Sequence, residues 1–102
     1  MKYNKLVRDK IPEIIKQKGE MLVSHTASDN EYWPKLKEKL NEEVNEFIEN
    51  SNEEELADIL EVIYAICDFK KIDRSKLELI RKKKADEKGA FKDKIILDET
   101  KQ

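Results

Sequence analysis

Four carboxylates in the middle of the chain have the spacing that a metal site shared by two helices requires. They are Glu43 and Glu46, followed by Glu55 and Asp58. Within each pair the residues are three positions apart, which on a helix places both side chains on one face with Cβ atoms about 5–6 Å apart. Two helices joined by a short turn pack at about 8–10 Å, so the four carboxylates can converge on one point.

Four carboxylates held so close repel one another unless a cation lies among them. Two unit charges about 6 Å apart repel by about 3 kcal/mol at an effective dielectric constant near 20. Summed over all pairs, this repulsion rivals the stability of a small domain, so either some carboxylates are protonated or a cation binds. Carboxylate oxygens without His or Cys suit a hard cation, which predicts Mg²⁺, with Mn²⁺ as the second choice.

The same acids could instead form an ordinary solvated helix face. In a chain with 23 Asp and Glu residues, pairs at this spacing often arise by chance. A solvated face that is stabilised by charge, however, normally carries Lys or Arg at spacing four. Residues 41–67 contain nine acids and no Lys or Arg, which favours the cation site.

The sequence pattern predicts four helices that position these residues. The expected fold is therefore an all-α, antiparallel four-helix bundle-type domain. The expected ranges are about 9–18, 31–50, 53–69 and 74–88, the middle two containing apolar residues at helical spacing. Asp9 and Asp73 are the expected N-caps of the first and last helices, and Gly19 and Gly89 follow their ends. Because the links are short, neighbouring helices should be antiparallel.

Two short apolar runs are candidates for a small two-stranded β patch. One lies in residues 20–26 and contains Met21-Leu22-Val23, and the other, residues 94–97, contains Ile95-Ile96-Leu97. Short apolar runs bounded by turn residues suit strands, so we expect these two segments to pair.

Length and composition predict one small domain, spanning residues 1–102, with much exposed charge. Of the 102 residues, 43% are charged and 38% hydrophobic, which favours amphipathic helices with part of their apolar surface buried between subunits. Apolar runs are too short for a membrane span or a signal peptide, and the single Cys67 excludes an internal disulfide, so a cytoplasmic location is expected. An acidic centre with basic ends argues against a nucleic-acid polymer as partner.

Three stretches of the chain, together with the acidic pairs, resemble the MazG-like all-α nucleoside triphosphate pyrophosphohydrolases. The opening reads Tyr3-Asn4-Lys5-Leu6-Val7-Arg8-Asp9-Lys10-Ile11-Pro12-Glu13, the third expected helix contains Glu54-Glu55-Leu56-Ala57-Asp58-Ile59-Leu60-Glu61-Val62-Ile63-Tyr64, and the end runs from Lys84 to Phe91. The chain is most similar to the phosphoribosyl-ATP-pyrophosphohydrolase-like subgroup. The superfamily also includes dimeric dUTPases and dCTP pyrophosphatases.

This resemblance implies hydrolysis between the α- and β-phosphates of a nucleotide, giving a nucleoside monophosphate and pyrophosphate. It implies that Glu43, Glu46, Glu55 and Asp58 hold Mg²⁺, and that the protein forms homodimers or homotetramers with the site near a subunit interface. One departure is Lys88-Gly89-Ala90-Phe91, where Arg-Gly-Gly-Phe is common in the subgroup. The phosphate contact there would then come from a point charge instead of a guanidinium fork.

Other residues are candidates for parts of such a site. Glu42, or a metal ligand with a free oxygen, is the candidate general base. The candidates for phosphate binding are Lys5, Arg8 and Lys10 in the opening and Arg81, Lys84 and Lys88 on one face of the last helix, although each could also be an ordinary solvated side chain. Glu61 is a candidate for an extra metal ligand, and a nucleotide base could stack on Trp33. His25 is not expected to contact the substrate.

Two other functions stay open on the sequence alone. The chain could be a non-catalytic helical module that dimerises through its apolar faces and does not respond to Mg²⁺. It could also hydrolyse phosphoribosyl-ATP in particular, because no residue pattern separates that substrate from an ordinary or non-canonical triphosphate.

Overall fold

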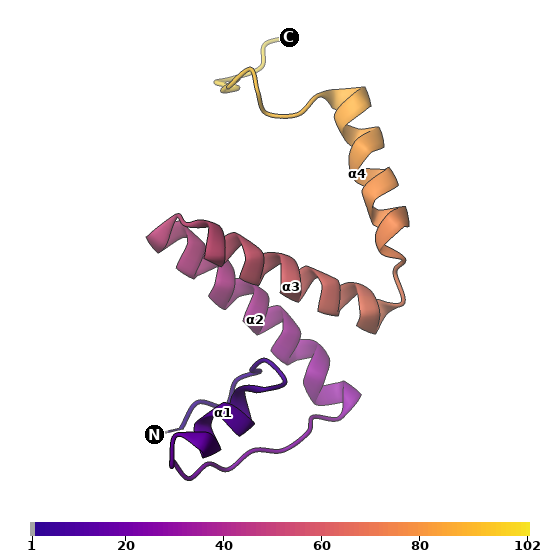
Figure 1. Cartoon of the computed structure of the whole chain (residues 1–102). Helices are drawn as coiled ribbons and strands as arrows, with labels where there is room; N and C mark the ends of the chain where they lie inside the picture. The colour runs from indigo at the N-terminus through magenta and orange to yellow at the C-terminus, as the bar shows by residue number, and fades with distance from the viewer. Residues whose placement is uncertain (1) are drawn as a thin grey trace.

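The computed structural model describes residues 2–102, and these form four helices (Figure 1). Helix α1 spans Ile11–Gln17, α2 spans Asp29–Asn50, α3 spans Glu53–Lys70 and α4 spans Arg74–Lys88. Each boundary lies within two residues of the position expected from the sequence, so the all-α prediction is confirmed. Among the described residues, no helix is long and apolar enough to cross a membrane.

Most of the expected helix ends are confirmed, with one exception. Asp73 caps α4, where its carboxylate accepts a hydrogen bond from the Ser75 N–H at 2.8 Å. Gly19 and Gly89 have φ angles of 81° and 87°, a region that glycine enters without strain. The expectation for Asp9 is wrong, because the N-cap residue of α1 is Lys10 and no side chain caps this helix. Pro12 in the first turn has no N–H, so one of the donors that a capping side chain could serve is missing.

The expected β patch is wrong. Residues 20–26 and 94–97 are irregular, and residues 2–102 contain no strand. Figure 1 shows the first segment beside α1 and the second beyond α4, on the opposite side of α2 and α3. Met21 is 100% exposed and Ile95 80% exposed, so neither run has a core to pack on, and an unsupported two-stranded ribbon is marginal in water.

An antiparallel hairpin of α2 and α3 is the packed centre of the chain (Figure 1). Ser51, in the left-handed region with φ of 55°, ends α2 and donates its N–H to the Phe47 carbonyl oxygen. Asn52 then caps α3, its side-chain oxygen accepting from the Glu55 N–H at 3.0 Å. The most buried apolar side chains, Leu36 on α2 and Val62 and Cys67 on α3, all lie in this hairpin.

Aromatic rings close the open end of the hairpin, away from the Ser51–Asn52 turn. Trp33 near the start of α2 stacks on Phe69 near the end of α3, with ring centroids 5.6 Å apart and planes 8° apart. Tyr32 meets the edge of the same Phe69 ring at 5.4 Å, and the Lys70 ammonium lies 4.4 Å from the Trp33 ring centroid. These contacts give Trp33 a packing role within the chain.

Helix α4 and the segment after it extend away from the hairpin (Figure 1). The radius of gyration is 18.3 Å, whereas a compact domain of about 100 residues has about 13 Å. Leu79 on α4 is 68% exposed, and Phe91 in the segment after it is 97% exposed. Within one chain, the antiparallel packing is therefore that of α2 against α3, and the apolar side of α4 is left open.

Leu36, at 1% exposure, should be the residue on which the hairpin's stability depends most. We expect Leu36→Ala to lower the free energy of unfolding by about 2–4 kcal/mol, because it removes buried methyl groups and leaves a cavity. The matched control is Val23→Ala in the fully exposed linker, which should change stability by less than about 0.5 kcal/mol. Urea unfolding followed by circular dichroism measures both, and equal effects would contradict the assignment of the core.

Candidate metal centre

Four carboxylates meet between α2 and α3. One oxygen from each of Glu43, Glu46, Glu55 and Asp58 lies within 4.8 Å of the others. The Ser51–Asn52 turn sets this register, because it fixes how α3 starts relative to the end of α2. Asn50 also donates to the Glu55 carboxylate at 3.4 Å, which ties one of the four to the preceding helix. The structure therefore brings together all four residues that the spacing singled out.

Glu43 is the carboxylate with the most unusual environment. The residue is 6% exposed, whereas the other three members of the cluster are half-buried. One of its oxygens lies 3.3 Å from the Lys39 ammonium, but its Oε2 atom has no hydrogen-bond partner in the part of the chain that the structure describes. Burial, followed by the proximity of the Glu46 carboxylate, raises the pKa of Glu43. A buried carboxylate oxygen without a partner is costly unless a proton or a cation compensates it.

These residues fit a hard divalent cation. The donor set consists of carboxylate oxygens alone, which Mg²⁺ and Mn²⁺ accept and which softer metals do not prefer. No hydrogen bond in the described chain compensates the negative charge on the buried Oε2 atom of Glu43, and a cation bound among the four carboxylates would compensate it. Glu61, the candidate extra ligand, is exposed and lies outside the group of converging oxygens.

Basic residues from the opening of the chain lie at the rim of the cluster. The Arg8 guanidinium contacts the Asp58 carboxylate at 2.7 Å, and this hydrogen bond raises the pKa of Arg8. The Lys5 ammonium contacts Glu42, next to the cluster, at 3.0 Å. Two of the three opening residues proposed for phosphate binding are thus placed at the acids, and the third, Lys10, is exposed just before α1.

Lys39 is a member of this site that the sequence reasoning missed. Its ammonium lies 3.3 Å from both Glu42 and Glu43, three and four positions further along α2. That spacing is the ordinary signal for an ion pair on a helix, but Lys39 lies just before residues 41–67, which contain no Lys or Arg. Burial favours a higher pKa for Glu42, but the hydrogen bonds from Lys5 and Lys39 outweigh it and lower the pKa.

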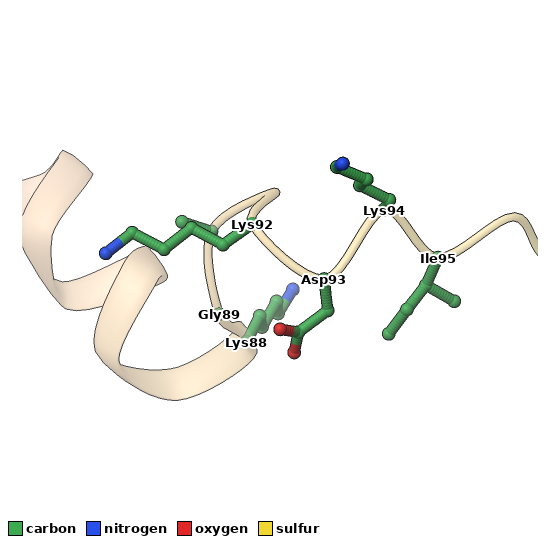
Figure 2. Close-up of a pocket in the computed structure, with 7 residues that line it drawn as sticks. Lys88, Gly89, Lys92, Asp93, Lys94 and Ile95 are labelled. Atoms are coloured by element: carbon green, nitrogen blue, oxygen red, sulfur yellow. The ribbon is translucent and has the colours of Figure 1, made fainter.

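The basic residues of α4 have other neighbours. Arg81 forms an ion pair with Glu78 one turn away, and Lys84 and Lys88 are exposed. Figure 1 shows α4 directed away from the hairpin, so these three residues and the acid cluster are well separated within one chain. Where α4 ends, a hollow of ≈ 270 Å³ is lined by Lys88 and by Lys92, Asp93 and Lys94 of the following segment (Figure 2).

His25 lies in the irregular linker between α1 and α2. Its Nε2 atom is 2.8 Å from the Glu31 carboxylate at the start of α2. This contact gives His25 a local role at the entry to α2 and places it outside the carboxylate cluster.

Comparison with known proteins adds one partial similarity. No family model matches the chain, and no solved structure matches it either. An uncharacterized protein of Mycolicibacterium smegmatis is 56% identical over 41 residues, which is 40% of this chain and 42% of that protein. The chain thus matches less than half the length of this relative, and the similarity carries no activity with it.

The raised pKa of Glu43 predicts how metal-free stability depends on pH. Because the folded pKa exceeds the ordinary value of 4.5, this residue's contribution is favourable below that value and is lost as pH rises through the folded pKa. Glu43→Gln should remove this loss, so that in EDTA the variant gains stability relative to the wild type as pH rises. Urea midpoints measured from pH 4 to pH 8 test this, with exposed Glu49→Gln on α2 as the control. A constant difference between Glu43→Gln and the wild type over that range would contradict it.

Proposed function

We propose that this protein is a Mg²⁺-dependent hydrolase that cleaves a nucleoside triphosphate, canonical or non-canonical, between its α- and β-phosphates. The products are a nucleoside monophosphate and pyrophosphate. The observation that carries the proposal is the buried, unpartnered Glu43 Oε2 within a group of four converging carboxylates. The resemblance of the opening, the acidic pairs and the end of α4 to MazG-like pyrophosphohydrolases supplies the reaction.

The carboxylates of Glu43, Glu46, Glu55 and Asp58 would hold the cation. When bound, Mg²⁺, or Mn²⁺ in its place, supplies positive charge that neutralises phosphate oxygens and the departing pyrophosphate. Half-burial of the cluster strengthens this binding, because water screens the carboxylates less than it would on an open surface.

Arg8 and Lys5 are the chain's own candidates for the remaining phosphate charge. Both lie at the rim of the cluster, and Lys10 follows two residues after Arg8. The planar guanidinium of Arg8 can donate two parallel hydrogen bonds to a phosphate, whereas the lysines act as point charges. These side chains would hold the phosphates of the substrate against the metal centre.

Proton transfer from the attacking water requires a base whose pKa is close to the working pH. Glu42 is a weak candidate for this role, because Lys5 and Lys39 lower its pKa. Its contacts suit it better to holding these two lysines beside the cluster. A cluster carboxylate that keeps one oxygen free of the cation is the other candidate.

A second copy of the chain belongs to this proposal, as a homodimer or homotetramer. The exposed apolar side chains of α4 and of the segment after it need a covering surface, and the single chain is elongated. Packing of α4 against another copy could bring Arg81, Lys84 and Lys88 towards that copy's carboxylates. We also propose a cytoplasmic location, as expected for an enzyme that acts on free nucleotides, with no nucleic-acid polymer or membrane as partner.

The exposed apolar faces also favour a second candidate function, a non-catalytic helical dimerisation module. Leu56 and Leu60 on α3 are 51% and 46% exposed, and they lie on the same helix face. A module of this kind would use these faces to associate and would have no need of a cation.

A pyrophosphate-release screen tests the enzymatic proposal. The full chain is incubated with canonical triphosphates, modified triphosphates and phosphoribosyl-ATP, with Mg²⁺, with Mn²⁺ and with EDTA. Glu43→Gln and Asp58→Asn should each lower turnover by at least about 10–100-fold, the loss seen even for residues that only support metal ligands. Glu49→Gln is the matched control. Full activity in both cluster variants, or no turnover of any substrate, would reject the hydrolase.

Cation binding should also stabilise the fold. At a Mg²⁺ concentration one hundred times its Kd, the free energy of unfolding should rise by about 2.7 kcal/mol, which corresponds to a shift of several degrees in Tm. Glu43→Gln should abolish most of this shift, and NaCl at matched ionic strength should not produce it. An unchanged Tm in Mg²⁺ and in Mn²⁺ would favour the dimerisation module.

A further inference from the structure

The opening of the chain is attached to the hairpin mainly by polar contacts. The Asn4 carbonyl oxygen accepts a hydrogen bond from the Lys35 ammonium at 2.6 Å, and Lys5 contacts Glu42 at 3.0 Å. Arg8 then contacts Asp58 across the hairpin, on α3, at 2.7 Å. Of residues 2–10, all are exposed except the half-buried Leu6. Contacts of this kind, with little apolar burial, can break and re-form without disturbing a core.

Asp58 takes part in two arrangements that compete electrostatically. It is one of the four carboxylates that converge between α2 and α3, and it is also the partner of the Arg8 guanidinium. A divalent cation among the four carboxylates would neutralise Asp58 and repel the guanidinium beside it. The cation would not displace Lys5 from Glu42 in this way, because Glu42 is not one of the four converging carboxylates.

We propose that Arg8 is an internal competitor of the metal, and that Asp58 exchanges Arg8 for the cation when the cation binds. The proposal rests on the metal centre of the proposed function. Asn4 and Lys5 keep the start of the opening segment attached to α2, so that Arg8 turns away from Asp58 while staying at the rim. The freed guanidinium would remain at the rim of the four carboxylates, where its fork could hold a phosphate of the substrate. Metal binding thereby prepares the phosphate site, and the metal-free protein keeps it closed.

The start of the segment makes two polar contacts with α2, from Asn4 and Lys5, whereas Arg8 makes a single one with α3. Asn4 has φ of 49°, in the left-handed region that asparagine tolerates better than most residues. This bend directs its carbonyl oxygen to Lys35 on α2, one turn before Lys39. The pivot of the exchange is therefore at Asn4 and Lys5, and the moving part is the stretch that ends at Arg8.

Metal affinity without any nucleotide tests the exchange. Isothermal titration of the full chain with Mn²⁺ should show that Arg8→Gln binds the ion about two- to fivefold more tightly, since an exposed ion pair competes by about that factor. Arg8→Lys should restore wild-type affinity, because it keeps the charge. Arg74→Gln is the matched control: it removes a similar exposed pair, with Asp68 on α3 at 3.4 Å, that lies outside the cluster. Unchanged or weaker binding by Arg8→Gln would overturn the proposal.

Hydrogen exchange gives a second, independent measurement. Saturating Mg²⁺ should speed exchange of the Ile11 amide in the wild type, because this amide donates to the Arg8 carbonyl oxygen at 3.0 Å, whereas exchange around Arg74 should not change. Slower exchange in the opening segment on adding Mg²⁺ would also overturn the proposal, because the segment would then close over the ion. If Mn²⁺ binds with the expected variant effects but no triphosphate is hydrolysed, the exchange stands and the hydrolase fails. If the wild type binds no cation, both fail.

Discussion

Repulsion among the four carboxylates between α2 and α3 is the constraint on which the rest of the structure depends. The tight turn at Ser51 and Asn52 brings the two acidic pairs together, and burial of Leu36, Val62 and Cys67 holds the helices in that register. Apolar burial of this small extent has to oppose the repulsion of charges less than 5 Å apart. The hairpin therefore needs compensating positive charge, and the positions of Lys39, Lys5 and Arg8 follow from that need.

This compensation is incomplete at one atom. Lys39 contacts one oxygen of Glu43 and Arg8 contacts Asp58, but neither forms a hydrogen bond with the buried Oε2 of Glu43. In the proposed function, a small cation held by the four carboxylates would bring positive charge to this region without a further basic residue.

Most of the α2–α3 hairpin could be predicted from the sequence, but few of the contacts that the rest of the chain makes with it could be. Spacing alone placed Glu43, Glu46, Glu55 and Asp58 on facing sides of two helices, because helix periodicity and a short turn leave few alternatives. The β patch failed because Met21 and Ile95 belong to apolar runs without a period, and such runs carry no information about a partner. Lys39 was missed although its spacing to Glu43 is local, whereas the contact of Arg8 with Asp58 spans 50 positions and no local pattern encodes it.

Helix α4 is a second case in which the local sequence predicts the helix but not the surface on which it packs. Its apolar spacing predicts a helix, and ion pairs such as Lys82 with Asp86 support it locally, but each contributes only a few tenths of a kcal/mol. A helix of 15 residues is marginal in water on such support alone. An ordered α4 therefore requires a surface for Leu79 and its neighbours, and the hairpin of the same chain does not cover them. The exposed Leu56 and Leu60 on α3 offer an apolar surface of the same kind, and a second copy in the proposed oligomer would cover both surfaces.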